Sequence, residues 1–311
     1  MATPEAPLRE ILKSVSFTQF PLRVIEPFFV ADKIVKPRLY IYPSFAVHKE
    51  TMANDEKRPM LPTFDVKSLY MLTALKFAKY DFDIAYTSEP DASPDGSLPF
   101  LLLRDGTALD FKAIMSKLQQ NSTELGCATE EQPDYISDVD GDLEMPKNEL
   151  PSEPVYRTMV ENNLLPVIEY LTWTDPVGRE CIGEGKYLGS YPQIIRNMLS
   201  WIAATDTAHK LKLGLPEYGA DAMVLDGEVL YENAFRTLDS LLVLLHTVDD
   251  SRLFLAGAPS LLDALVFACV NVFLYAPVKS PVRTALLKSD STYKPVLEYA
   301  VRIFDQYFAS A

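Results

Sequence analysis

The chain has 311 residues, of which 48% are hydrophobic, and a formal net charge of −14 at pH 7. This length holds one large or two ordinary domains with a substantial core. Broad electrostatic binding to nucleic acid or to an anionic lipid surface requires clustered Lys and Arg, which the sequence lacks, so both functions are excluded. The acidity is local. Residues 121–154 hold ten Asp and Glu against one Lys, whereas residues 1–62 hold nine Lys and Arg against seven acidic residues.

Cysteine and histidine are too sparse for a disulfide framework or a zinc site. The three of each are widely spaced, and this usage is typical of a reducing compartment. We therefore expect neither a metal nor a cofactor. The longest apolar run, residues 261–278, contains Asp263, Asn271 and Pro277. It is shorter than the roughly 20 apolar residues that a bilayer requires, so we interpret it as a buried core helix. The N-terminus resembles neither a signal peptide nor a transit peptide, and membrane association is expected only through a partner.

The N-terminal part predicts an arm followed by a small α/β unit. Prolines punctuate residues 1–36, which we interpret as an arm on the protein surface or on a partner. Beyond it, hydrophobic patterning and turn signals indicate the order β-α-β-loop-β-β-α. This order predicts a thioredoxin-like subdomain over residues 37–120, with its second connecting helix replaced by a loop. Its assigned elements are strand 38–42, helix 66–80 capped by Asp65, strand 81–86, strand 98–103 and helix 108–119.

The remaining sequence divides into an acidic insert and a helical domain. Residues 121–154 contain few large apolar residues, so we expect a disordered segment that cannot bury enough surface to become ordered. Residues 155–311 show helical periodicity throughout and predict an all-helical C-terminal domain. The expected helices are 154–174, 191–213, 221–247, 260–275, 282–288 and 292–308.

Two motifs carry most of the information about the fold. Pro99 precedes a strand, as in thioredoxin-like folds, where the proline is cis; the alternative is a simple bend at the strand start. Ser260 and Asp263 form the S-x-x-D capping box of the apolar helix, and no histidine lies nearby to support a catalytic role. A thioredoxin-like half followed by a helical half with this box resembles the glutathione transferases. The expected fold class is therefore α/β plus all-α, with a thioredoxin-like subdomain and a C-terminal helical bundle.

The glutathione-transferase resemblance also indicates where catalysis would occur. The activating hydroxyl lies just after strand one, where this chain has Tyr42 and Ser44. Pro43 and the long loop separate these hydroxyls from the helix N-terminus that stabilises a thiolate, and tyrosine is also a common strand residue. In transferases a Glu or Gln followed by Ser binds the γ-glutamyl end, and the matching pair here is Asp110-Phe111. Phe111 lacks a hydroxyl, and one lost hydrogen bond costs about 1–3 kcal/mol. We interpret the glutathione site as erased.

A more specific resemblance comes from three segments. Leu98-Pro99-Phe100-Leu101 comes first, followed by the segment Asp105-Gly106-Thr107-Ala108-Leu109-Asp110-Phe111. The third is Pro259-Ser260-Leu261-Leu262-Asp263-Ala264-Leu265-Val266-Phe267, the most specific of them. Together they resemble the metaxin family, mitochondrial outer-membrane proteins that kept a transferase-like fold for protein import. The resemblance covers about residues 38–308 and gives no account of the acidic insert.

The resemblance implies a function without catalysis. The chain is similar to the smaller metaxin-like subunit of the fungal sorting and assembly machinery, which lacks a C-terminal anchor. It implies a peripheral position on the cytosolic face of the mitochondrial outer membrane. The implied partners are a membrane β-barrel subunit, a second metaxin-like subunit and β-barrel precursor proteins. Two alternatives stay open: a divergent glutathione transferase that uses Tyr42 or Ser44, and a free cytosolic adaptor with a transferase-like fold.

Overall fold

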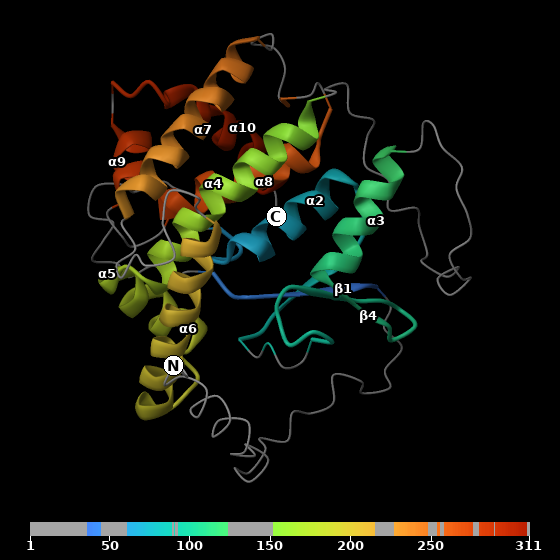
Figure 1. Cartoon of the computed structure of the whole chain (residues 1–311). Helices are drawn as coiled ribbons and strands as arrows, with labels where there is room; N and C mark the ends of the chain where they lie inside the picture. Colours follow the sequence, from blue (N-terminus) through green and yellow to red (C-terminus); the bar gives the residue numbers. More distant parts are fainter. Residues whose placement is uncertain are drawn as a thin grey trace.

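A computed structural model gives the arrangement of the chain in two halves (Figure 1). Helices α2 (Val66–Phe77) and α3 (Phe111–Thr123) lie beside a small sheet, and a larger group of helices forms the rest. The predicted arm up to residue 35 and residues 124–151 of the predicted acidic segment lie outside the described residues. The described residues are 36–44, 61–88, 90, 93–123, 152–214, 227–247, 254–255, 258–275, 280–288 and 290–309.

The sheet has four strands in the order β2-β1-β3-β4. Strand β1 pairs with β2 in parallel and with β3 antiparallel, and β4 pairs antiparallel with β3. A parallel neighbour requires a crossover connection, which α2 supplies between β1 and β2. The paired residues Tyr40 and Phe100 stack with their ring centroids 4.6 Å apart. The thioredoxin-like half is thus confirmed. Its strands are β1 (Arg38–Ile41), β2 (Asp83–Tyr86), β3 (Phe100–Leu102) and β4 (Ala108–Asp110).

One predicted helix start is wrong. The sequence indicated a helix from Ala108, but Ala108–Asp110 forms β4, and α3 begins only at Phe111. The turn after β3 reverses the chain, and the Leu101–Leu109 pair holds the three residues in the sheet. The Asp110 side chain then accepts a hydrogen bond of 2.7 Å from the N–H of Ala113, as an N-cap does. Three residues are too few for alternation to signal a strand.

The C-terminal half is helical, as predicted. Each helix expected there is present with shifts of a few residues at its ends, and α7 begins at Gly227. The acidic segment predicted over 121–154 overlaps α3 and α4 at its two ends. A one-turn helix, α5 (Pro176–Gly178), and a π-helix, η3 (Arg179–Tyr187), were not predicted. The other helices are α4 (Glu153–Trp173), α6 (Gln193–Gly214), α7 (Gly227–Thr247), α8 (Leu261–Tyr275), α9 (Pro281–Leu287) and α10 (Lys294–Tyr307).

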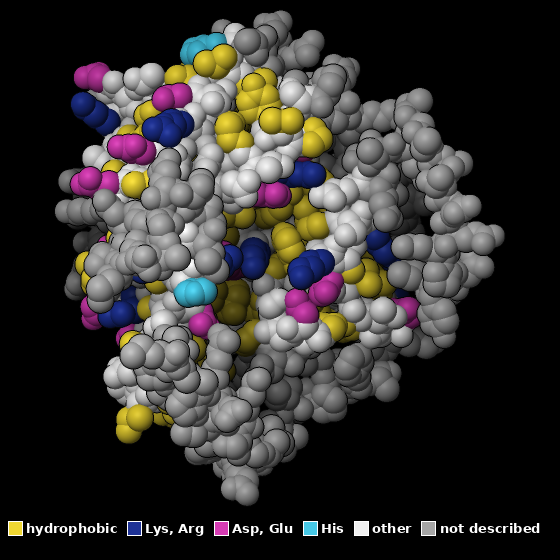
Figure 2. Space-filling model, viewed as in Figure 1, with side chains coloured by type: hydrophobic (Ala, Val, Ile, Leu, Met, Phe, Trp, Pro, Cys, Tyr) yellow, Lys and Arg dark blue, Asp and Glu magenta, His cyan; other side chains and the backbone are white. Residues whose placement is uncertain are grey.

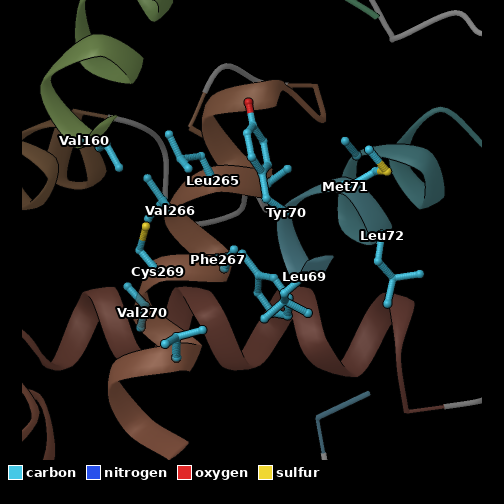
Figure 3. Close-up of a cluster of buried hydrophobic side chains, with 14 of the residues drawn as sticks. Leu69, Tyr70, Met71, Leu72, Val160, Leu265, Val266, Phe267, Cys269 and Val270 are labelled. Atoms are coloured by element: carbon cyan, nitrogen blue, oxygen red, sulfur yellow. The ribbon is translucent and has the colours of Figure 1, made fainter. Parts of the chain in front are cut away.

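Helix α8 is the centre of the core. Every residue from Leu261 to Leu274 is buried, which explains why its sequence is apolar on all sides. Figure 3 shows side chains of α2, among them Leu69 and Tyr70, lying near Leu265 and Phe267 of α8. This packing joins the two halves into one hydrophobic cluster. Within the described part of the chain, no helix has both the length and the apolar character to cross a membrane.

Candidate functional site

The first candidate site is the end of β1, where a transferase would place its activating hydroxyl. The Tyr42 side chain is buried there among aromatic rings. Its ring lies edge-on to Tyr187 at a centroid distance of 4.9 Å and tilted against Phe64 at 5.5 Å. Tyr187 comes from η3, so a residue of the helical half fills this position. Ser44 lies two residues beyond Tyr42 in the chain.

Asp65 lies beside Tyr187, at the N-terminus of α2. Its Oδ2 accepts a hydrogen bond of 2.7 Å from the N–H of Ser68, and its Oδ1 accepts one of 2.6 Å from the Tyr187 hydroxyl. A buried carboxylate at this position satisfies the helix N-terminus and complements its partial positive charge. Burial raises the pKa of Tyr187 well above its ordinary value, and Asp65 adds to this rise, so the hydroxyl remains a donor.

The unpredicted π-helix positions Tyr187. Two glycines allow η3 and the residue before it to pack closely against the C-terminal end of α4. A Cβ on Gly178 would lie 1.7 Å from the carbonyl oxygen of Leu171, and one on Gly183 would lie 2.9 Å from the Trp173 ring. Only glycine therefore fits at these two positions without displacement of the neighbours. This element was not predicted from the sequence.

A second predicted site lies where β3 leads into α3. The Leu98–Pro99 peptide bond is cis. Asp110 caps α3, as described above, so its carboxylate is already bonded within the chain. Phe111 is half-buried, and its ring is tilted against that of Tyr70 with centroids 5.9 Å apart. The positions that hold the γ-glutamyl end in transferases thus contain a helix cap and a packed phenyl ring.

A third predicted feature is the capping box at the start of α8. The Ser260 N–H donates to Oδ2 of Asp263 at 3.0 Å, and the Asp263 N–H donates to the Ser260 hydroxyl at 3.1 Å. Asp263 is fully buried, and its other oxygen accepts bonds from the Leu255 N–H and the Tyr299 hydroxyl. Burial raises the pKa of Asp263 from 3.8 to about 6, against the opposing effect of these hydrogen bonds.

Sequence reasoning missed one further residue at this helix start. Glu153, the first residue of α4, is buried, and its Oε1 accepts a hydrogen bond of 3.1 Å from the Leu262 N–H. Burial raises the pKa of Glu153, although nearby Arg157 lowers it. Two carboxylates, from α4 and α8, therefore satisfy the N-terminus of the core helix. No local pattern could have indicated this, because Glu153 and Leu262 are 109 residues apart.

The surface and the boundary between the two halves show where apolar side chains are accessible. Figure 2 shows a hollow near the middle of one face, with hydrophobic side chains inside it and Lys and Arg side chains nearby. The small cavity between the halves is apolar, with Phe64, Ile168, Tyr187 and Phe273 among the residues that line it. Over the described ranges, no three His, Cys, Asp or Glu side chains gather as a metal site would require.

Comparison with known proteins shows which proteins the chain is similar to. Residues 68–179 match the Tom37 family model, described as an outer mitochondrial membrane transport complex protein. Metaxin-1 of Mus musculus is 24% identical over 249 residues, covering 80% of this chain and 72% of that protein. A metaxin-1 homolog of Caenorhabditis briggsae is 25% identical over 221 residues, covering 70% and 62%. The chain is thus similar to the metaxin family over most of its length. The region matched by the family model runs from α2 to the first residue of η3, and it includes Pro99 and Phe111 but not Asp263.

Solved structures with a similar arrangement are glutathione transferases and a related enzyme. A glutathione S-transferase of Ceriporiopsis subvermispora in complex with glutathione has 12% identity and a TM-score of 0.49, covering 88% of this chain and 99% of its own. A beta-etherase of a Sphingobium strain has 14% identity and a TM-score of 0.45, covering 89% and 100%. The glutathione-transferase-like fold class of this chain follows from its own sheet order and from the helical half that follows the sheet.

Proposed function

We propose that this chain is a non-catalytic subunit of the machinery that inserts and folds β-barrel precursors in the mitochondrial outer membrane. It is peripheral, lies on the cytosolic face, and binds a membrane β-barrel subunit, a second metaxin-like subunit and the precursors. The match of residues 68–179 to an outer mitochondrial membrane transport complex protein supports this assignment. The likeness to metaxin-1 over most of the chain supports it independently.

The observation that carries the non-catalytic part is the Asp65–Tyr187 contact. A thiolate is stabilised at a helix N-terminus by free N–H groups and by the absence of other negative charge. Here the Asp65 carboxylate takes the N–H of Ser68 and the hydroxyl of Tyr187. A second negative charge about 4 Å away would be disfavoured by about 4 kcal/mol at an effective dielectric constant of about 20. The position that should activate a sulfur nucleophile instead repels it.

The residues at α3 support the same conclusion. Asp110 is used as a cap and Phe111 packs against Tyr70, so the γ-glutamyl end of glutathione finds neither a free carboxylate nor a hydroxyl. In our proposal the glutathione site is erased. Replacing Phe111 by Ser restores the missing hydroxyl but leaves Asp65 and Tyr187 in place, so the Phe111→Ser chain should still fail to bind glutathione resin.

The test of the proposed function is a pull-down of the tagged chain from mitochondria in mild detergent, followed by mass spectrometry of partners. We expect a membrane β-barrel protein and a second metaxin-like protein at comparable amounts. A matched control carries the same tag on an unrelated outer-membrane protein. Recovery of a soluble homodimer that elutes with glutathione would instead favour a transferase that uses Tyr42 or Ser44. Recovery from the cytosol without a membrane partner would favour the free adaptor.

The N-terminal arm is proposed to contribute to partner binding. The first 62 residues have a net positive charge, which favours an acidic partner surface. Deletion of residues 1–35 retains Lys36, whose Nζ lies 2.9 Å from Asp81. The truncated chain should therefore keep this contact at the sheet while it co-purifies less of the barrel subunit. Unchanged recovery of that subunit would remove the arm from the proposal.

A further inference from the structure

Strand β2 is an outer strand of the sheet, and no other described strand pairs with its outer edge. The Asp83 N–H donates to the Pro37 carbonyl at 2.9 Å, and the Thr87 N–H donates to the Ile41 carbonyl at 3.0 Å. In a parallel pair, the backbone N–H and C=O groups of every second residue point toward the neighbouring strand. Those of Asp83 and Ala85 point toward β1, so the N–H and C=O groups of Ile84 and Tyr86 point away from it. Among the described residues, none forms a backbone hydrogen bond with these groups.

The side chains at this edge continue the apolar surface of the sheet. Ile84 pairs with Leu39 and Tyr86 pairs with Ile41, so each pair lies on the same face. Leu39 and Ile41 are fully buried, whereas Ile84 is 37% and Tyr86 is 56% exposed. Apolar contact area is therefore available beside unpaired backbone groups, which together are what an added strand needs.

Natural edge strands are protected by short length, charged side chains, proline, a bulge or a covering element. Strand β2 has two of these features, because it is four residues long and carries the exposed Asp83, but among the described residues it has neither a bulge nor a proline. Asp83–Tyr86 contains neither lysine nor proline, and its four residues pair with β1 in continuous register. The opposite edge differs, because β4 leads directly into α3 and its central residue, Leu109, is buried. Of the two edge strands, β2 is the one whose apolar side chains are exposed.

The charge at this edge is negative. Asp83 is exposed, and Asp81 keeps 70% of its side-chain surface exposed even though Lys36 pairs with it. A segment that pairs with β2 would bring its own side chains close to these carboxylates. Basic side chains are favoured in such positions, and acidic ones are disfavoured.

We propose that β2 is a docking edge for an extended segment of a partner protein. The segment has apolar side chains at alternate positions, which cover Ile84 and Tyr86, and a basic side chain near Asp83. It binds through the backbone groups of Ile84 and Tyr86 and adds a fifth strand to the four-stranded sheet. This inference goes beyond the proposed function and does not depend on it, because any partner with such a segment fits the edge.

Amide hydrogen exchange of the full chain tests the proposal residue by residue. The probe is a short synthetic peptide of alternating valine and threonine with one lysine. At saturation, exchange of the Ile84 and Tyr86 amides should slow by about tenfold or more, which corresponds to about 1.4 kcal/mol. The Ala85 amide already faces β1 and should change little. The same peptide with N-methyl groups on alternate residues cannot pair and is the matched control.

Two variants separate backbone pairing from side-chain contact. Ile84→Pro removes an outward N–H but leaves the β1-facing groups of Asp83 and Ala85, as tolerated for edge prolines. It should abolish peptide binding, whereas Ile84→Ala should weaken it only a few-fold. Unchanged exchange at Ala85 verifies that the variant sheet is intact. If Ile84→Pro fails to fold, the exchange map of the unmodified chain decides alone.

Three outcomes would overturn the proposal. Slowed exchange confined to residues other than Ile84 and Tyr86, or no slowing at any peptide concentration, would exclude pairing at this edge. Slow exchange of both amides in the free chain at every protein concentration would mean that the chain covers its own edge. Slow exchange that appears only at high protein concentration would assign the edge to a second copy.

Discussion

Asp65 and Asp263 perform the same task at two different places in the molecule. Each is a buried aspartate at the start of a helix, and each accepts a hydrogen bond from the hydroxyl of a tyrosine distant in sequence. The Asp263 cluster lies within the helical half, where Ser260 and Leu255 also donate to it. The Asp65 cluster joins the two halves, because its tyrosine comes from η3.

The difference shows one capping device in two surroundings, one within the helical half and the other where the two halves meet. At α8 the carboxylate satisfies donors that would otherwise be buried without partners. At α2 the Asp65 carboxylate accepts from the Ser68 N–H at the helix N-terminus and from the Tyr187 hydroxyl of the helical half. The comparison holds if loss of Asp263 mainly affects folding, and loss of the Asp65 contact mainly affects how the two halves meet.

Replacement of Asp263 by Asn should give the largest effect. The amide group keeps one acceptor oxygen and turns an NH2 group toward donors, so two or more of the buried N–H and O–H groups lose their acceptor. Each unsatisfied buried group costs about 1–3 kcal/mol, and we expect a loss of about 4 kcal/mol. Urea unfolding followed by circular dichroism measures this loss.

The chain offers a matched control for this substitution. Asp239 also accepts a hydrogen bond from a tyrosine hydroxyl, that of Tyr293, at 2.9 Å, but the pair is exposed. Because water replaces the lost partner there, Asp239→Asn should cost less than about 0.5 kcal/mol. Equal losses in Asp239→Asn and Asp263→Asn would show that burial of Asp263 does not determine its contribution.

The pH dependence of the free energy of unfolding should reveal the raised pKa of Asp263. Its pKa rises from 3.8 to about 6 on folding because of burial, so between these values the folded chain holds a proton that the unfolded chain has lost. The contribution of this group to stability therefore falls as pH rises from about 4 to about 6, and is constant above. The change is on the order of 2–3 kcal/mol.

The difference in unfolding free energy between the unmodified chain and Asp263→Asn separates the contribution of Asp263 from those of the other carboxylates. Glu153 also has a raised pKa and adds a change of the same sign, whereas Asp95 and Asp105 have lowered pKa values and act oppositely. The free energy of unfolding of the unmodified chain and of Asp263→Asn is measured from pH 4 to pH 7 and plotted against pH. The slopes of the two plots should differ most below pH 6. Parallel curves would contradict a raised pKa of Asp263.

The two clusters also show what sequence can and cannot predict. The Ser260–Asp263 spacing of three residues is a local signal, so this box was predicted. The tyrosines that complete the clusters lie 36 and 122 residues from their aspartates, and nothing near either tyrosine indicates the contact. Long helices were predicted because apolar periodicity repeats over many residues, whereas β4 and α5 are three residues long and η3 departs from helical periodicity.

Among the substitutions within the two clusters, removal of the Tyr187 hydroxyl should have the smallest effect. Tyr187→Phe keeps the ring contacts with Tyr42 and Phe64 and removes only the donor to Asp65, which still accepts from Ser68. We expect a loss of about 1 kcal/mol. Tyr299→Phe is the matched variant in the other cluster, and it should cost more because Asp263 is fully buried. Both are measured in the same urea unfolding series. If Tyr187→Phe proved the more destabilising of the two, the contact between the halves would contribute more to folding than the cluster in the core.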